Sequence, residues 1–286
     1  MELIQPTTLE DALAAKAARP TSLPIAGGTD VMVDLNFDRE RPEAILDLTR
    51  VPELSGWWPA NGRLRVGAGI TYARAISELG EPLPGLALAS RTVGSPQIRN
   101  RGTIGGNLGA ASPAGDAHPP LLAARAEVEL ASTRGVRRVP VRDFYVAPKR
   151  NALRDDELIV AVHVAPARGP EQFSKIGTRN AMVIAACSFA LAIDPFDRRV
   201  GTGIGSAGPT PLVAAEAEAF LEGVLTEAGA WEDRTPLEAP ALERFGELVA
   251  SAARPIDDVR STAAYRVHAL GVLARRTLAW ARSGEG

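Results

Sequence analysis

The chain has 286 residues, 45% of them hydrophobic, which is enough for a large buried core and suggests two domains. Lys and Arg total 32 against 34 for Asp and Glu, and a net charge of −2 argues against nucleic acid or an anionic membrane as the partner. The start of the chain, Met1 to Pro6, lacks the basic and apolar regions of a secretory signal, and no window approaches the roughly 18 apolar residues of a membrane span. We therefore expect a cytoplasmic protein.

Cysteine and histidine are too sparse for a metal centre in this chain. Cys187 is the only cysteine and lies in an apolar run, so we expect a buried, inert thiol and no internal disulfide. His118, His163 and His268 are far apart in the sequence. A self-contained iron–sulfur or zinc site is therefore not expected, and any metal centres that exchange electrons with this protein must lie on other chains.

Residues 1–58 are predicted to form a small α/β unit. Thr8 can cap a helix that runs to Ala17, and short strands are expected at 23–26 and 44–48. Between them, Gly27-Gly28-Thr29-Asp30 connects a strand to a helical run at 31–35. Such a glycine loop suits a ligand, but an ordinary strand–turn–helix connection explains it about equally well.

A dinucleotide-binding fold of the Rossmann type is rejected. Gly67-Ala68-Gly69 begins like its glycine motif, but Tyr72 occupies the position of the third glycine. We expect a strand at 64–66 followed by a helix capped by Thr71.

The segment from Thr92 to Leu122 is the strongest candidate for a binding site. Its glycines are expected to take positive φ angles and to bring backbone N–H groups close to a ligand. These glycines are Gly102, Gly105, Gly106 and Gly109, and the small polar residues among them are Thr103, Asn107 and Ser112. The alternative is that the glycines only make tight turns in a loop-rich domain.

Asp116 precedes Pro119, Pro120 and an apolar run at 121–126. This order predicts a helix with Asp116 at its cap. The positive end of a helix dipole would stabilise an anion placed there.

The rest of the chain is predicted to pass from strands to helices. A hairpin is expected from strands at 127–130 and 136–141, followed by a strand at 158–164 and a boundary at 165–172. Beyond the boundary we expect three antiparallel strands and then helices. These strands are placed at 173–180, 183–193 and 200–206, and the helices at 212–225 and 257–282.

The run Thr103-Ile104-Gly105-Gly106-Asn107, followed by Ser112-Pro113 and Asp116, resembles the flavin loop of the FAD-binding subunit of the molybdenum hydroxylases, the family of xanthine dehydrogenase and carbon monoxide dehydrogenase. The resemblance implies an α+β fold with a PCMH-type FAD-binding domain of two α/β subdomains, at 1–58 and 59–168. A C-terminal domain at 169–286 would hold the three-stranded antiparallel sheet and a helical bundle.

The resemblance also implies which residues bind FAD. The first flavin segment, along the pyrophosphate, would be Ile25, Ala26, Gly27, Gly28, Thr29 and Asp30; the second would be Thr103, Ile104, Gly105, Gly106 and Asn107, with Ser112 and Asp116. Leu158 would pack near the isoalloxazine, and Lys175 would lie near the flavin ring and tune it. A helix cap is the alternative role for Asp116 and a surface charge that for Lys175. Phosphate pairing, a partner contact and surface ion pairing remain open for Arg99 and Arg101.

The implied function is that of the FAD subunit of a multi-chain oxidoreductase. A large subunit would carry molybdopterin, a small subunit two [2Fe-2S] clusters, and this chain would pass electrons from FAD to NAD or another acceptor, in a dimer of heterotrimers. The loop at 26–30 favours xanthine dehydrogenase, since the carbon monoxide branch usually has His-Ser after the paired glycines. Alternatives are a carbon monoxide or N-heteroaromatic dehydrogenase subunit, a self-sufficient flavoenzyme of related fold such as an alcohol oxidase or enolpyruvyl-sugar reductase, and a nucleotide-binding regulatory subunit.

Overall fold

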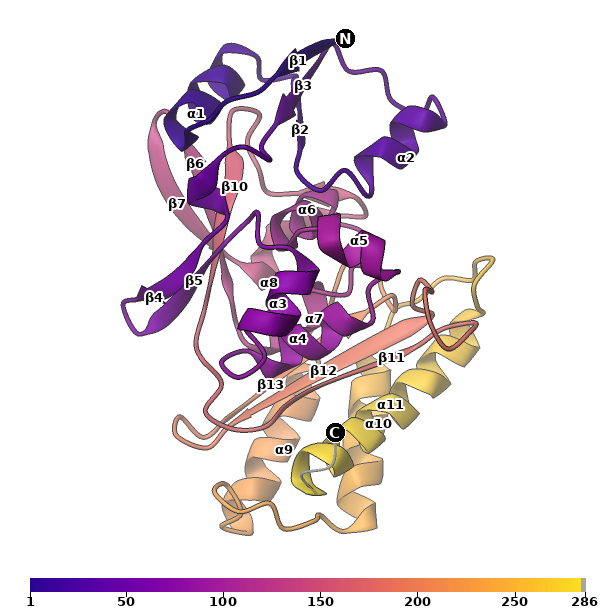
Figure 1. Ribbon diagram of the computed structural model, residues 1–286. Helices are drawn as coiled ribbons and strands as arrows, with labels where there is room; N and C mark the ends of the chain where they lie inside the picture. The colour runs from indigo at the N-terminus through magenta and orange to yellow at the C-terminus, as the bar shows by residue number, and fades with distance from the viewer. Residues whose placement is uncertain (284–286) are drawn as a thin grey trace.

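The computed structural model describes residues 1–283. The chain passes through three regions in sequence order, as the colours of Figure 1 show: a small parallel sheet, a five-stranded antiparallel sheet with helices, and a three-stranded antiparallel sheet backed by long helices. The predicted α+β fold class is confirmed. None of the helices within residues 1–283 is long and apolar enough to cross a membrane.

The N-terminal sheet is parallel, with the order β1 (Glu2–Ile4), β3 (Ala44–Asp47), β2 (Leu23–Ile25). Helix α1 (Leu9–Ala18) begins where predicted, because the Thr8 hydroxyl accepts a hydrogen bond from the Asp11 amide at 3.1 Å. Helix α2 (Val31–Asn36) buries none of its side chains and stands to one side of this sheet (Figure 1). A 3₁₀ turn, η1 (Pro52–Leu54), leads to the second region.

The second sheet has the order β4 (Trp57–Ala60), β5 (Arg63–Gly67), β10 (Leu158–Val164), β6 (Glu127–Ser132), β7 (Gly135–Pro140). All its pairings are antiparallel, and the predicted hairpin is the β6–β7 pair. A short ribbon of β8 (Tyr145–Ala147) and β9 (Arg150–Asn151) follows. The helices of this region are α3 (Tyr72–Glu78), α4 (Pro84–Arg91), α5 (Pro96–Arg101), α6 (Ile104–Ala110), α7 (His118–Ala123) and α8 (Val141–Phe144).

The third sheet has the order β11 (Glu171–Ile176), β12 (Cys187–Asp194), β13 (Arg199–Gly205). Figure 1 shows the sheet between α4 and α7 above and three C-terminal helices below, which are α9 (Ala215–Glu227), α10 (Ala239–Ala252) and α11 (Ala263–Ser283). One buried cluster joins β12 and β13 to these helices. Cys187 is fully buried there, as expected.

Some predicted boundaries in this region were wrong. Strand β12 begins at Cys187 rather than at 183, and α11 begins at Ala263 rather than at 257. Residues 257–262 form a turn instead, because Asp258 and Ser261 exchange backbone hydrogen bonds. Helix α10 had no counterpart in the prediction.

The expected loop at 102–109 is largely helical. Gly105, Gly106 and Gly109 lie in α6, and neither they nor Gly102 has a positive φ angle. Their use is close packing rather than left-handed backbone: a Cβ atom on Gly105 would lie 2.5 Å from the Cβ atom of Ala68. The positive-φ expectation was therefore wrong for these four glycines.

Asp116 is not a helix cap. The residue at the N-cap of α7 is Ala117, and no side chain caps this end. The Asp116 carboxylate pairs with Lys175 instead. Asp116 also lines the cavity described below.

Candidate functional site

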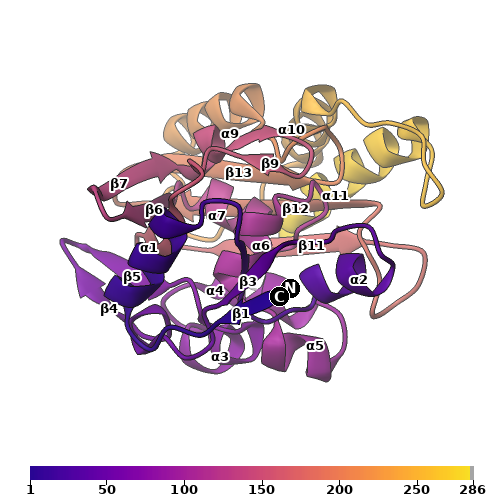
Figure 2. The ribbon, with the colours of Figure 1, turned by 90° about the horizontal axis from the view of Figure 1, so that it is seen from above.

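A cavity of about 600 Å³ lies where the three regions meet. Its walls come from residues after β2, from α6 and the turn that follows it, and from residues 182–184 between β11 and β12. Figure 1 shows β2 and β3 above α6, and β3 again overlaps α6 when the molecule is seen from above in Figure 2. Cavities of this size hold small-molecule ligands and cofactors in proteins.

The two glycine segments are in direct contact. A Cβ atom on Gly27 would lie 1.9 Å from the carbonyl oxygen of Arg101 and 2.9 Å from the Cα atom of Gly102. No other residue could therefore hold the backbone at 27 against the end of α5. Gly28 has φ of +74°, a left-handed conformation that favours glycine. Both segments therefore face one cavity, although the sequence places them more than 70 residues apart.

The segments differ in what their backbone amides do. In α6, the Ile104 amide donates to the Ile70 carbonyl, the Gly105 amide to the Ala68 carbonyl, and the Gly106 amide to the Thr103 hydroxyl. By contrast, within residues 1–283 the amides of 27–30 donate to no protein acceptor. The first segment therefore has four successive free N–H groups beside the cavity, whereas in the second segment the free amides of lining residues are isolated ones, at Thr103, Ser112 and Asp116. Successive unpaired amides with one left-handed residue form an anion-binding concavity.

Most of the sequence-predicted residues line this cavity. They are Ala26, Gly27, Gly28, Thr29, Asp30, Thr103, Gly105, Gly106, Asn107, Ser112, Asp116 and Leu158. Ile25, Ile104 and Lys175 do not. Ile25 supports the Gly28 turn from behind, Ile104 is fully buried in the core of the second region, and Lys175 stands behind Asp116.

The Lys175–Asp116 pair connects the third region to the cavity wall. Lys175 Nζ lies 2.7 Å from Asp116 Oδ2 and 3.1 Å from the Thr92 carbonyl oxygen. Burial raises the pKa of the Asp116 carboxyl to about 6, although Lys175 opposes the rise. The second oxygen, Oδ1, is buried and has no hydrogen-bond partner within residues 1–283, and the same is true of Oδ1 of Asn107. Two acceptors on the cavity lining are thus unsatisfied by protein.

The structure also decides what Arg99 does. Its guanidinium donates to the carbonyl oxygens of Val93 and Gly94 and so holds the turn before α5. Among the described residues neither Arg99 nor Arg101 forms an ion pair.

Several cavity residues were not found from the sequence. Tyr72, Val93 and Gly94 line the cavity, and so does Lys149, which pairs with Asp34 at 3.6 Å. The rejected Gly67-Ala68-Gly69 segment contained a usable signal, because Ala68 and Gly69 line the cavity and Ala68 packs against Gly105. Nothing in the sequence marked residues 182–184 as part of the same wall.

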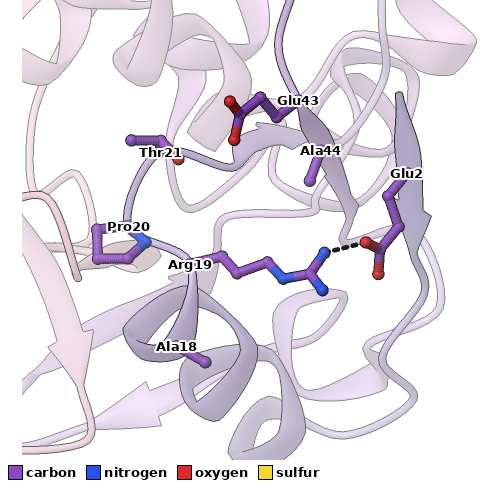
Figure 3. A pocket seen from close by; sticks show the side chains of 7 residues that line it. All are labelled: Glu2, Ala18, Arg19, Pro20, Thr21, Glu43 and Ala44. Carbon is purple, nitrogen blue, oxygen red and sulfur yellow. Dashed lines mark hydrogen bonds and ion pairs between the residues drawn. The ribbon is translucent and has the colours of Figure 1, made fainter.

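A second hollow, of about 420 Å³, lies at the N-terminal sheet (Figure 3). It is bounded by Glu2, Arg19, Pro20 and Glu43 among others, and Arg19 pairs with Glu2 across it. Both partners of this pair are about half exposed, and neither glycine segment reaches it. The candidate site is therefore the larger cavity.

Comparison with known proteins agrees with this geometry. Residues 1–167 match the family described as FAD binding domain in molybdopterin dehydrogenase, and residues 172–281 match the CO dehydrogenase flavoprotein C-terminal domain. The chain belongs to the FAD-binding subunits of the molybdenum hydroxylases. Members of this family are subunits of oxidoreductases, and FAD is their cofactor.

Individual relatives of this FAD-binding subunit cover most or nearly all of its length. It is 30% identical over 289 residues to the xanthine dehydrogenase FAD-binding subunit of Escherichia coli O157:H7, covering 98% of this chain and 95% of the relative. It is 33% identical over 236 residues to the nicotinate dehydrogenase FAD-subunit of Eubacterium barkeri, covering 78% and 79%. A chain of reconstituted CO dehydrogenase from Oligotropha carboxidovorans superposes with a TM-score of 0.88 at 26% identity, covering 99% and 98%.

The cavity of this FAD-binding subunit fits its cofactor. The free amides at 27–30 suit a diphosphate, which needs several N–H donors. The unpaired oxygens of Asp116 and Asn107 suit hydroxyl or N–H donors of the cofactor. Leu48, Leu54 and Leu158 add an apolar wall of the kind that packs against a ring.

Proposed function

We propose that this chain is the FAD subunit of a xanthine dehydrogenase-type complex and passes electrons from partner subunits to NAD or another acceptor. The single observation that carries this proposal is that the two glycine segments converge on one cavity in a chain similar over 98% of its length to a xanthine dehydrogenase FAD-binding subunit. Molybdopterin and [2Fe-2S] clusters would be carried by a large and a small partner subunit. We further propose a dimer of such three-chain units, acting in the cytoplasm.

The first glycine segment would hold the diphosphate. Its amides at 27–30 are free, and the contact between Gly27 and Arg101 fixes their direction. Thr103, Gly105 and Gly106 would form the opposite wall, where the absence of side chains on the glycines lets the cofactor approach α6. Bound FAD supplies the step between carriers that give one electron at a time and an acceptor such as NAD that takes a hydride.

Away from the amides at 27–30, the ion pair of Asp116 and Lys175 would set the charge at the cavity wall. Lys175 does not line the cavity, so its proposed effect on the flavin acts through Asp116 and through the field of the buried pair. Replacing Lys175 by Met would leave Asp116 without its cation and raise its pKa further above 6. We expect the flavin midpoint potential and the rate of NADH formation to change. Unchanged values for both would remove Lys175 from a tuning role.

A second candidate is a complex that oxidises another N-heteroaromatic compound. It is favoured by the 33% identity to the nicotinate dehydrogenase FAD-subunit of Eubacterium barkeri. The substrate would be chosen on the large subunit in either case, so both candidates make the same use of the cavity in this chain.

Purification of the native complex tests the proposal. A tag on this chain is expected to bring down two further subunits, with molybdenum and iron in the preparation and NADH formed when xanthine is added. Nicotinate turnover without xanthine turnover would favour the second candidate. Substrate turnover by the isolated chain would overturn both and support a self-sufficient flavoenzyme. Failure of the isolated chain to take up FAD would favour a nucleotide-binding regulatory subunit.

A further inference from the structure

Arg266, in the first turn of α11, is a buried arginine that binds two separate backbone segments. It is 4% exposed. One nitrogen of its guanidinium, Nη1, donates to the carbonyl oxygen of Ala186 at 2.8 Å and to that of Ser206 at 2.7 Å. The other, Nη2, lies 2.5 Å from Oδ1 of Asp258. The guanidinium therefore joins the residue before β12 to the residue after β13.

The contact with Ala186 fixes the end of a segment that lines the cavity. Residues 177–186 connect β11 to β12, and the lining includes 182–184. The Ala186 amide donates to the Ile176 carbonyl oxygen at 2.8 Å, which closes the base of this connection. Because Arg266 binds the carbonyl oxygen of the same residue, both polar groups of the Ala186 backbone are held.

The contact with Ser206 leads to a second part of the cavity lining. Ser206 has φ of +58°, a left-handed conformation that serine rarely adopts unless its surroundings hold it there. Its carbonyl oxygen accepts from Arg266, and its amide donates to the Pro113 carbonyl oxygen at 2.8 Å. Pro113 lies in the turn after α6, and its neighbours Ser112 and Ala114 both line the cavity.

Two parts of the lining, 182–184 and the turn at 112–116, are thus connected to one guanidinium that is not itself part of the lining. We propose that Arg266 is a positioning residue of the cofactor site, which sets the spacing of these two parts without touching the cofactor. Asp258 supplies the counter-charge, and its carboxylate is fixed by the amides of Arg260 and Ser261. This inference rests on the proposed binding of FAD in the cavity.

Arg282 offers a matched control on the same helix. It is 1% exposed, donates to the carbonyl oxygens of Ala230 and Thr235, and pairs with Asp233 at 3.0 Å. None of these four residues lines the cavity. A lysine in place of either arginine keeps the positive charge but loses the planar group that reaches three acceptors at once. The two variants should therefore differ only in what happens at the cavity.

The test compares Arg266→Lys and Arg282→Lys in the full chain, freed of cofactor. Both variants should lower the melting temperature by a similar amount, since each weakens a buried set of hydrogen bonds. Only Arg266→Lys should speed hydrogen exchange at the amides of Ala186 and Ser206. In calorimetric titration, only Arg266→Lys should weaken FAD binding, by about tenfold, the effect of one misplaced polar contact.

Wild-type FAD affinity in a folded Arg266→Lys chain, or an equal loss in Arg282→Lys, would overturn the inference. If Arg266→Lys does not fold, Asp258→Asn takes its place, because it leaves both carbonyl contacts of the arginine available. Asp258→Asn should show the same changes at smaller size, and unchanged FAD affinity would again overturn the inference. If the wild-type chain takes up no FAD, the proposed function fails. The exchange rates then still report on Arg266, and unchanged rates in Arg266→Lys would show that it does not hold the two segments.

Discussion

Two groups of glycines in this protein let other backbone segments approach closely, but only one of the two groups lies beside a cavity. Along β13, Gly201, Gly203 and Gly205 face α7, and Cβ atoms on the first two would lie 1.9 Å from the Ala123 carbonyl oxygen and 2.0 Å from that of Pro119. At the cavity, Gly27 meets Arg101 just as closely. On β13 the helix fills the space that the glycines leave. At the cavity, packing occupies one side and the free amides line the other.

The comparison shows that a glycine-rich run reports close backbone approach, not ligand binding. What marks the cavity group as a site is the set of unsatisfied polar atoms beside it: the amides at 27–30 and the oxygens of Asn107 and Asp116. Beside the β13 glycines, the described part of the chain leaves a single such side-chain atom, the hydroxyl oxygen of Ser206, and the strand itself carries ordinary ladder bonds to β12. Three glycine substitutions test this difference, and a fourth substitution tests a buried carboxylate near α7.

The largest effect is expected from Gly203→Ala. Its new Cβ atom would meet backbone rather than a flexible side chain, so α7 must lift from the sheet. We expect the free energy of unfolding to fall by about 3 kcal/mol or more in urea denaturation. Gly223→Ala is the control, because nothing lies within 4 Å of its Cβ position in α9, and it should stabilise by about 0.5–1 kcal/mol. Equal effects would refute the packing argument.

Gly27→Ala should act mainly on the cofactor. The added methyl group drives the first segment away from Arg101 and turns the amides at 27–30, so we expect FAD affinity to fall about a hundredfold, or about 2.7 kcal/mol. The unfolding free energy should fall by only about 1–2 kcal/mol, because the C-terminal core is remote. Wild-type FAD affinity in the folded variant would contradict the proposal that the amides at 27–30 bind the cofactor.

Glu171→Gln tests the contact between α4 and β11 through the pH dependence of the unfolding free energy. The Glu171 carboxylate accepts from the Gly85 amide at 3.0 Å, and burial raises the pKa of Glu171 to about 7. A raised pKa means that stability is full below pH 4.5 and is lost as the pH rises through 7. The variant should therefore be about 2 kcal/mol more stable than wild type at pH 8 and no more stable at pH 4.5. Glu216→Gln, at an exposed position, is the control and should show no such difference. A gain in stability that is the same at pH 4.5 and pH 8 for Glu171→Gln would contradict the raised pKa of Glu171.

Gly106→Val is expected to have the smallest effect of the four. The φ angle of Gly106 is not positive, and a Cβ atom there would meet only the Thr103 hydroxyl, at 2.9 Å. Its branch would narrow the cavity, so we expect about a tenfold loss of FAD affinity by fluorescence titration, with the C-terminal domain still folded. A loss equal to that of Gly27→Ala would mean that α6, not the first segment, carries the diphosphate.

The sequence predicted the fold class and most of the cavity lining because local patterns mark them. Thr8 and Thr71 cap their helices as expected, and residues of both glycine segments line one cavity. The assignment of roles within the lining could not be predicted, because it depends on distant partners. The amides of Ile104 and Gly105 donate to the carbonyl oxygens of Ile70 and Ala68. Asp116 pairs with Lys175, which lies 59 residues further along the chain. In the sequence, Tyr72 was noted only because it occupies the position of the third glycine of a Rossmann motif.

Hydrogen exchange of backbone amides with and without FAD measures the central claim directly. In the free chain, the amides at 27–30 should exchange fast and those at 104–106 slowly, since only the latter are bonded within the protein. Added FAD should slow exchange at 27–30 much more than at 104–106. Protection that appears at 104–106 alone, with 27–30 unchanged, would contradict the assignment of the diphosphate to the first glycine segment.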